Sequence, residues 1–163
     1  MVWLTIVFVI LMAVSPLFWM RNTPQQNRLE KIRSLARSHG IEITLHRRPD
    51  AREGENRLEA VCYKLPWHSS QSKKKWVLHR NSNRGWESDL AGWRSVTGDE
   101  GKLSGTDIEL VFDSMPDTVS AVMLDCQGVG LIWNESEGEE MVSSILEKLQ
   151  SLRSFFEKKS PNT

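Results

Sequence analysis

The residues best suited to acid–base, nucleophilic or metal chemistry are the histidines and cysteines, which are scattered along the 163-residue chain. The four histidines are His39, His46, His68 and His79, and the two cysteines are Cys62 and Cys126. None of them forms an H-E-x-x-H or C-x-x-C spacing, which would place two metal ligands close together. Both cysteines lie in or beside apolar runs, which favours buried small side chains over nucleophiles. We therefore expect no metal site, no catalytic thiol and no cofactor.

The glycine-containing signatures of common enzymes are also missing. The sequence has no G-x-x-x-x-G-K-[ST] phosphate loop, no G-x-G-x-x-G dinucleotide turn and no G-x-S-x-G nucleophile elbow. This pattern favours a non-catalytic protein. The alternative is an enzyme or ligand-binding domain whose site is assembled from distant residues, for example Cys62, His68, His79 and Glu135.

Basic and aromatic residues alternate between positions 73 and 93. The segment contains Lys73 to Trp76, Arg80, Arg84, Trp86 and Trp93. Such a mixture can stack on nucleic-acid bases. It equally suits core tryptophans beside a solvated rim. For this reason we do not expect the chain to bind nucleic acid.

The first twenty residues carry no charged side chain, which predicts a transmembrane anchor over residues 1–20. Trp3 and Trp19 lie near its two ends, where indole rings favour the headgroup level, and Pro16 is a candidate kink. A cleaved signal peptide is the main alternative. It is disfavoured because a basic n-region and a small-residue cleavage site are both missing.

Basic residues follow this segment and set the expected orientation. They are Arg21, Arg28, Lys31, Arg33 and Arg37, opposed only by Glu30. Since cytoplasmic flanks carry the excess of Lys and Arg, we expect an outward N-terminus and a cytoplasmic C-terminal domain at the inner membrane. The bilayer and other membrane proteins are then the expected partners.

Residues 21–40 have the pattern of a short basic amphipathic helix. Thr23, Pro24 and Gln26 form a helix start, and Gly40 provides a stop. Leu29, Ile32, Leu35 and Ala36 recur at helical spacing. This helix could lie on anionic headgroups or pack on the domain that follows.

Residues 41–163 predict one α+β domain, a mainly antiparallel sheet packed by a C-terminal amphipathic helix. Expected strands cover residues 41–46, 58–65, 75–79, 119–124 and 129–133, with the first three in a meander and the last two as a central hairpin. Residues 107–115 fit a strand or a helix, and a Thr106–Glu109 capping box favours the helix. The final helix has the apolar stripe Val142, Ile145, Leu149, Leu152 and Phe156.

The two halves of the chain after the anchor carry opposite charge. Residues 21–96 contain 16 Lys and Arg against 8 Asp and Glu, an excess of 8 positive charges. Residues 97–163 contain 5 against 13, an excess of 8 negative charges. Such opposition suits either a basic face turned toward anionic lipid or two halves that attract each other within one fold.

Residues 13–33 resemble the YajC-type accessory subunit of the preprotein translocase. The likeness consists of an uncharged helix followed by Arg21, Pro24, Gln25, Gln26 and Arg28, with Asn22 and Thr23 inserted after the first arginine. The glycine-rich turn of that family has no counterpart downstream. The resemblance implies a bacterial inner-membrane protein that contacts translocase components. Together with the other patterns, it predicts a single-pass membrane protein with a non-catalytic cytoplasmic interaction domain, acting as an accessory subunit.

Overall fold

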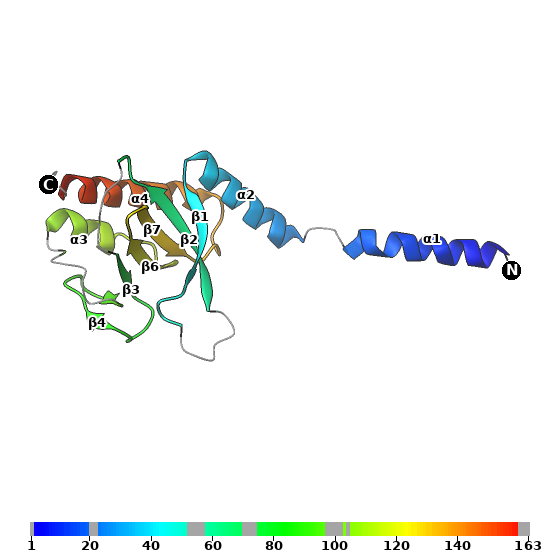
Figure 1. The fold of residues 1–163 in the computed structure, drawn as a ribbon, viewed down its shortest axis with the longest axis horizontal. Coiled ribbons are helices and arrows are strands. Elements are labelled where there is room, and N and C mark those ends of the chain that lie inside the picture. Colours follow the sequence, from blue (N-terminus) through cyan, green and yellow to red (C-terminus); the bar gives the residue numbers. More distant parts are fainter. Residues whose placement is uncertain are drawn as a thin grey trace.

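The computed structural model describes residues 2–19, 23–51, 58–69, 75–96, 103 and 105–159, with side chains in α1 described as far as Met12. Four helices and seven strands lie in these ranges (Figure 1). The helices are α1 (Val2–Trp19), α2 (Pro24–Ser38), α3 (Thr106–Asp113) and α4 (Glu140–Lys159). The strands are β1 (Glu42–Arg47), β2 (Glu59–Pro66), β3 (Trp76–His79), β4 (Trp86–Glu87), β5 (Arg94–Ser95), β6 (Val119–Leu124) and β7 (Gly128–Trp133).

All strands join one antiparallel sheet in the order β1-β2-β7-β6-β3-β5-β4. The predicted antiparallel sheet and the central β6–β7 hairpin are confirmed. The predicted meander is wrong, because the hairpin separates β2 from β3. Every residue of β7 is buried. A strand that is apolar on both faces is most stable in the middle of a sheet, where neighbours cover it on all sides.

One face of the sheet carries the main core. Side chains that alternate along the strands, such as Tyr63, Leu65 and Leu131, pack there against α2, α3 and α4. The five residues of the predicted α4 stripe are all buried, which confirms that this stripe belongs to the core. α2 and α4 lie along the same side of the sheet (Figure 1). The opposite face holds a smaller cluster, formed by Cys62, Val77, Ala121, Met123 and Ile132.

In the part of the chain that the structure describes, no helix combines the length and the apolarity needed to cross a bilayer. This contradicts the transmembrane anchor predicted for residues 1–20 and the membrane-spanning part of the predicted fold.

α2 confirms the predicted helix start. Thr23 accepts a hydrogen bond from the backbone N–H of Gln26, and the Gln26 side chain accepts one from the N–H of Thr23. α3 confirms the predicted helix over 107–115, but its N-cap is Gly105 and no side chain caps it. The predicted capping role of Thr106 is therefore wrong, since Thr106 is already the first helical residue.

Candidate binding groove

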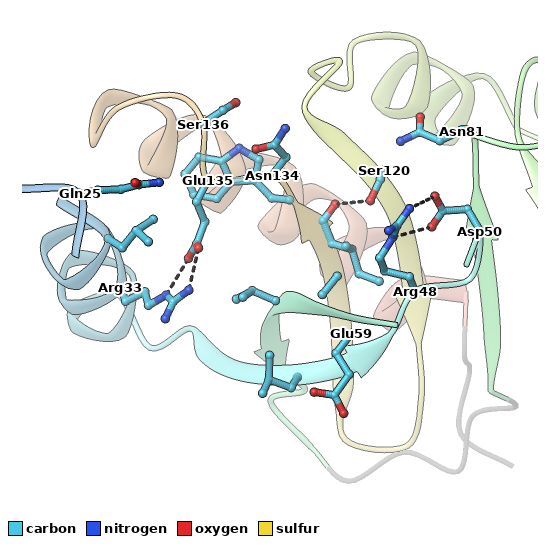
Figure 2. A pocket seen from close by; sticks show the side chains of 16 residues that line it. Gln25, Arg33, Arg48, Asp50, Glu59, Asn81, Ser120, Asn134, Glu135 and Ser136 are labelled. Carbon is cyan, nitrogen blue, oxygen red and sulfur yellow. Dashed lines mark hydrogen bonds and ion pairs between the residues drawn. The ribbon is translucent and has the colours of Figure 1, made fainter. Parts of the chain in front are cut away.

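A groove of about 660 Å³ crosses one end of the sheet, where β1 and β7 end and β2 and β6 begin (Figure 2). Residues from α2, four strands and three loops line it. They are Gln25, Leu29, Arg33, Leu45, Arg48, Asp50, Glu59, Ala60, Val61, Asn81, Ser120, Ile132, Trp133, Asn134, Glu135 and Ser136. The groove thus brings together polar residues that are far apart in the sequence.

A three-residue hydrogen-bond network forms one end of the groove. Arg33 on α2 donates from Nε to Glu135 Oε1 at 2.8 Å and from Nη2 to Oε2 at 2.7 Å (Figure 2). The hydroxyl of Tyr63, on β2, donates to the same Oε1 at 2.6 Å. Bidentate guanidinium–carboxylate pairs fix geometry as well as charge. The network therefore holds α2 against the end of β7 in a single arrangement.

The network also fixes the charge of Glu135. Burial by itself would raise the pKa of this carboxyl, but the hydrogen bonds from Arg33 and Tyr63 outweigh burial and the pKa lies below its usual value. Burial, followed by the neighbouring Glu135 carboxylate, raises the pKa of Tyr63. At neutral pH the carboxylate is charged and the phenol is protonated. Neither group is poised to exchange a proton.

A second ion pair forms the other end. Arg48, just after β1, donates from Nη2 to Asp50 Oδ2 at 2.7 Å and from Nε to Oδ1 at 3.3 Å (Figure 2). Burial alone would raise the pKa of Asp50, but the hydrogen bond and charge of Arg48, together with a backbone hydrogen bond, outweigh burial, and the pKa is lowered. Both ends of the groove thus carry an arginine held in place by a carboxylate.

Apolar and neutral polar groups lie between the two ion pairs. Leu45 and Val61 form an apolar floor beside Trp133. The indole Nε1 of Trp133 is buried and has no hydrogen-bond partner among the described residues. Ser120 donates to the backbone carbonyl of Ile132 at 3.3 Å. An apolar floor between fixed polar ends is the usual composition of a binding site that orients its ligand.

Some of the basic residues predicted for the membrane interface contact the domain, and others are exposed to solvent. Arg28 donates from one nitrogen to the backbone carbonyls of Glu135 at 3.3 Å, of Ser136, and of Glu137 at 2.8 Å. Arg33 lies in the groove, whereas Lys31 and Arg37 are exposed. Ile32 and Ala36 are fully buried, so α2 packs on the domain. Trp3 is exposed, and the side chains of Pro16, Trp19 and Arg21 lie outside those described.

The residues of the enzyme alternative do not come together. Of Cys62, His68, His79 and Glu135, only Glu135 lines the groove. Cys62 lies on the opposite sheet face, where burial raises the pKa of its thiol to about 12. His68 pairs with Glu157 at 3.0 Å, and His79 Nε2 lies 3.0 Å from the Arg84 carbonyl. The expectation of two buried cysteines is half right, because Cys126 is exposed.

The aromatic and basic segment contributes mainly to the core. Trp76 and Trp93 are buried, and the Arg80 guanidinium lies 5.3 Å from the centre of the Trp93 ring. Arg80 also donates to the backbone carbonyl of Val119 at 2.8 Å. Trp86 is exposed, and Lys73 lies outside the described residues. The expectation that this segment does not bind nucleic acid stays a prediction.

Sequence reasoning missed Tyr63, Arg48 and Asp50. Tyr63 is the only tyrosine of the chain, and an i, i+2 arginine–aspartate pair after a strand is a weak signal. Neither feature could reveal the groove without the sheet order.

Among the described residues, no group of three or more His, Cys, Asp and Glu side chains could hold a metal ion. Comparisons with protein-family models, curated proteins and solved structures find no match.

Proposed function

We propose that this chain is a non-catalytic accessory subunit, which joins a larger protein complex through α1 and presents a folded α+β domain. The observation that carries the proposal is the exposure of α1. Its described apolar side chains, Val2 to Met12, are between 45% and 81% exposed. Leaving such side chains in water costs about 1.5–3 kcal/mol each for the larger ones.

The apolar surface of α1 is continuous rather than one-sided. Of the residues from Val2 to Met12, only Thr5 is polar. The hydroxyl of Thr5 donates to the Val2 carbonyl at 2.9 Å, so it is satisfied within the helix. A helix that is apolar on every side is stable when other groups surround it. Figure 1 shows α1 apart from the sheet and from the other helices, so an external partner has to supply this cover.

The groove supports a binding role for the domain as well. Four of its five charged residues, Arg33, Glu135, Arg48 and Asp50, are engaged in ion pairs that keep each in one charge state. Such groups orient a bound molecule without supplying an acid, a base or a nucleophile. The Arg33–Glu135 pair also holds α2 on the domain.

In-cell crosslinking of a tagged full-length chain, followed by mass spectrometry, tests the proposal. We expect one or a few proteins to be recovered at near-stoichiometric levels. Changing Ile6 and Val9 on α1 to Glu should abolish the recovery, because burying an unpaired carboxylate against an apolar partner is strongly unfavourable. Recovery of translocase subunits would extend the resemblance at residues 13–33 to function.

Leu110→Glu is the matched control. Leu110 is on α3 and is 62% exposed, so this variant adds a carboxylate to an apolar surface position away from α1. It should retain the partner. Equal recovery with the α1 and Leu110 variants, or binding of the full chain to lipid vesicles without any protein partner, would overturn the proposal.

A further inference from the structure

The two edges of the sheet differ in how they are protected. β4, at one edge, is only two residues long. β1, at the other edge, has six residues in unbroken register with β2 and contains no proline or bulge. Edge strands in monomeric proteins are usually kept short or interrupted, because their unpaired backbone groups attract another strand. The length and regularity of β1 mark it as a pairing edge.

The backbone groups that β1 directs outward can be identified. The N–H of Arg48 donates to the Leu58 carbonyl at 2.8 Å, so even-numbered residues of β1 bond to β2. Since bonding alternates along an antiparallel strand, the N–H and C=O groups of Ile43, Leu45 and Arg47 point away from β2. Leu45 is 67% exposed, which leaves an apolar side chain beside these unpaired groups.

We propose that two copies of this chain associate through β1, pairing antiparallel with Thr44 opposite Thr44 of the second copy. In this register Ile43 lies opposite Leu45, and both are outward-bonding positions, so each pair exchanges two backbone hydrogen bonds. Glu42 lies opposite His46 on the other sheet face. The pairing joins two seven-stranded sheets into one continuous sheet.

Complementarity favours a second copy as the occupant. The register sets Ile43 against Leu45, an apolar cross-strand pair, and Glu42 against His46, whose imidazole N–H can donate a hydrogen bond to the carboxylate. A register shifted to Leu45 would instead set the Arg47 guanidinium against Ile43. The chain has a formal net charge of +0 at pH 7, so two copies do not repel each other.

Open space lies on both flanks of β1. A hollow of about 600 Å³ adjoins its first residues and is lined by Arg37, Gly40 and residues 41–44. The groove described above adjoins Leu45. Among the described residues, no strand occupies the outer edge of β1. The described residues therefore leave the outer edge of β1 open to a second copy.

Site-specific disulfide formation in the full-length chain tests the register. Thr44→Cys is introduced with Cys126→Ser, which removes the exposed native thiol, and with Cys62→Ala, which removes the thiol directly opposite position 44 on β2. Two Thr44 positions facing each other in a non-hydrogen-bonded pair are about 4.5 Å apart at Cα, within disulfide reach. We expect a covalent dimer on mild oxidation. Arg47→Cys in the same background is the control. In the proposed register, position 47 lies opposite position 41 of the second copy, six residues away from position 47 of that copy, so this variant should stay monomeric on gels without reducing agent.

Leu45→Lys provides a second measurement that does not depend on thiols. Because Leu45 is largely exposed, the variant should fold normally by circular dichroism, yet sediment as a monomer at concentrations where the parent dimerises. Leu110→Lys, at a similarly exposed leucine on α3, should sediment like the parent. Absence of the Thr44→Cys crosslink, an equal yield of covalent dimer from Arg47→Cys, or sedimentation of Leu45→Lys identical to that of the parent would overturn the proposal.

Discussion

Arg33 on α2 and Glu135 after β7 form a bidentate ion pair although 102 residues separate them. The side chain of Glu135 is 10% exposed and that of Arg33 is 34% exposed, so the carboxylate is largely shielded from water. Tyr63 and Arg28 add hydrogen bonds to the same Glu135 side chain and to its backbone carbonyl. This contact attaches α2 to the sheet.

Replacing Arg33 with Gln should destabilise the domain by about 1–3 kcal/mol, because it leaves a buried carboxylate without its cationic partner. Urea unfolding followed by circular dichroism measures the change. Arg37→Gln is the matched control on the exposed side of the same helix and should change stability by less than about 0.5 kcal/mol. Equal effects of the two substitutions would show that the ion pair contributes nothing.

Gly130→Ala should destabilise the sheet by about 1–3 kcal/mol through overpacking. A Cβ at position 130 would lie 2.7 Å from Cys62 Sγ and 3.0 Å from Met123 Cγ. Combining it with Cys62→Ala removes the closer clash, so the double variant should lose less than the sum of the two single losses. Thermal unfolding measures all three variants.

Gly138→Ala controls for the general effect of replacing a glycine. An added Cβ there meets nothing within 4 Å, and Gly138 lies in the loop before α4. We expect no loss of stability, since alanine also restricts the unfolded chain. If Gly130→Ala changed stability as little as Gly138→Ala, the packing around Cys62 and Met123 would be loose enough to accept an added methyl group.

Features that depend on neighbouring residues could be read from the sequence. The α4 stripe, the Thr23 cap and the buried β6–β7 hairpin follow from local spacing, and each is confirmed. The sheet order could not be read, because it depends on which strands, far apart in the sequence, pair with each other and which of them occupy the buried centre of the sheet. The capping role of Thr106 failed for a local reason: Gly105, at φ 156°, adopts the cap position instead.

The groove was beyond sequence reasoning because its residues meet only after the sheet has formed. The charge asymmetry between the two halves of the chain has a counterpart in three ion pairs. Arg33–Glu135, Lys64–Asp125 and His68–Glu157 each join the basic first half to the acidic second half. Of the two explanations that the sequence left open, attraction within one fold accounts for these pairs. The resemblance at residues 13–33 and the expected cellular location stay predictions.

Lys64→Met should cost about 2–4 kcal/mol, because it leaves Asp125 without its cation in a mostly shielded site. Lys64 is 3% exposed, and its Nζ donates to Asp125 Oδ2 at 2.6 Å and to Gln127 Oε1 at 3.3 Å. Asp125 also accepts the N–H groups of Gln127 and Gly128 in the β6–β7 turn. Chemical denaturation of Lys64→Met, Asp125→Asn and the double variant measures the coupling.

The double variant decides how the energy is shared between the two residues. We expect its loss to be smaller than the sum of the single losses by about 1–2 kcal/mol, because each single change strands a buried partner. Strict additivity would mean that Lys64 and Asp125 act independently, with Asp125 serving only the turn.

Stability should fall as the pH is lowered below about 6.5, the usual pKa of an unfolded histidine. Burial lowers the pKa of His79, and the buried Nδ1 has no partner among the described residues. The unfolded chain therefore takes up a proton before the folded chain does, and the unfolding free energy declines between pH 6.5 and the lower folded pKa. Burial lowers the pKa of His46 in the same direction, so both residues contribute to this window. The carboxylates with lowered pKa values, such as Glu135, act only at more acidic pH.

His79→Gln should reduce this pH dependence, because the amide can still donate to the Arg84 carbonyl but does not titrate. Urea unfolding at a series of pH values from 8 to 5 measures it, and one histidine can account for a slope of at most about 1.4 kcal/mol per pH unit. The variant should lose some stability at pH 8 from altered packing, yet approach the parent as the pH falls. His39→Gln, at an exposed position, should keep the full slope. A His79→Gln curve parallel to that of the parent would show that His79 is not the titrating group, leaving His46 to account for the slope.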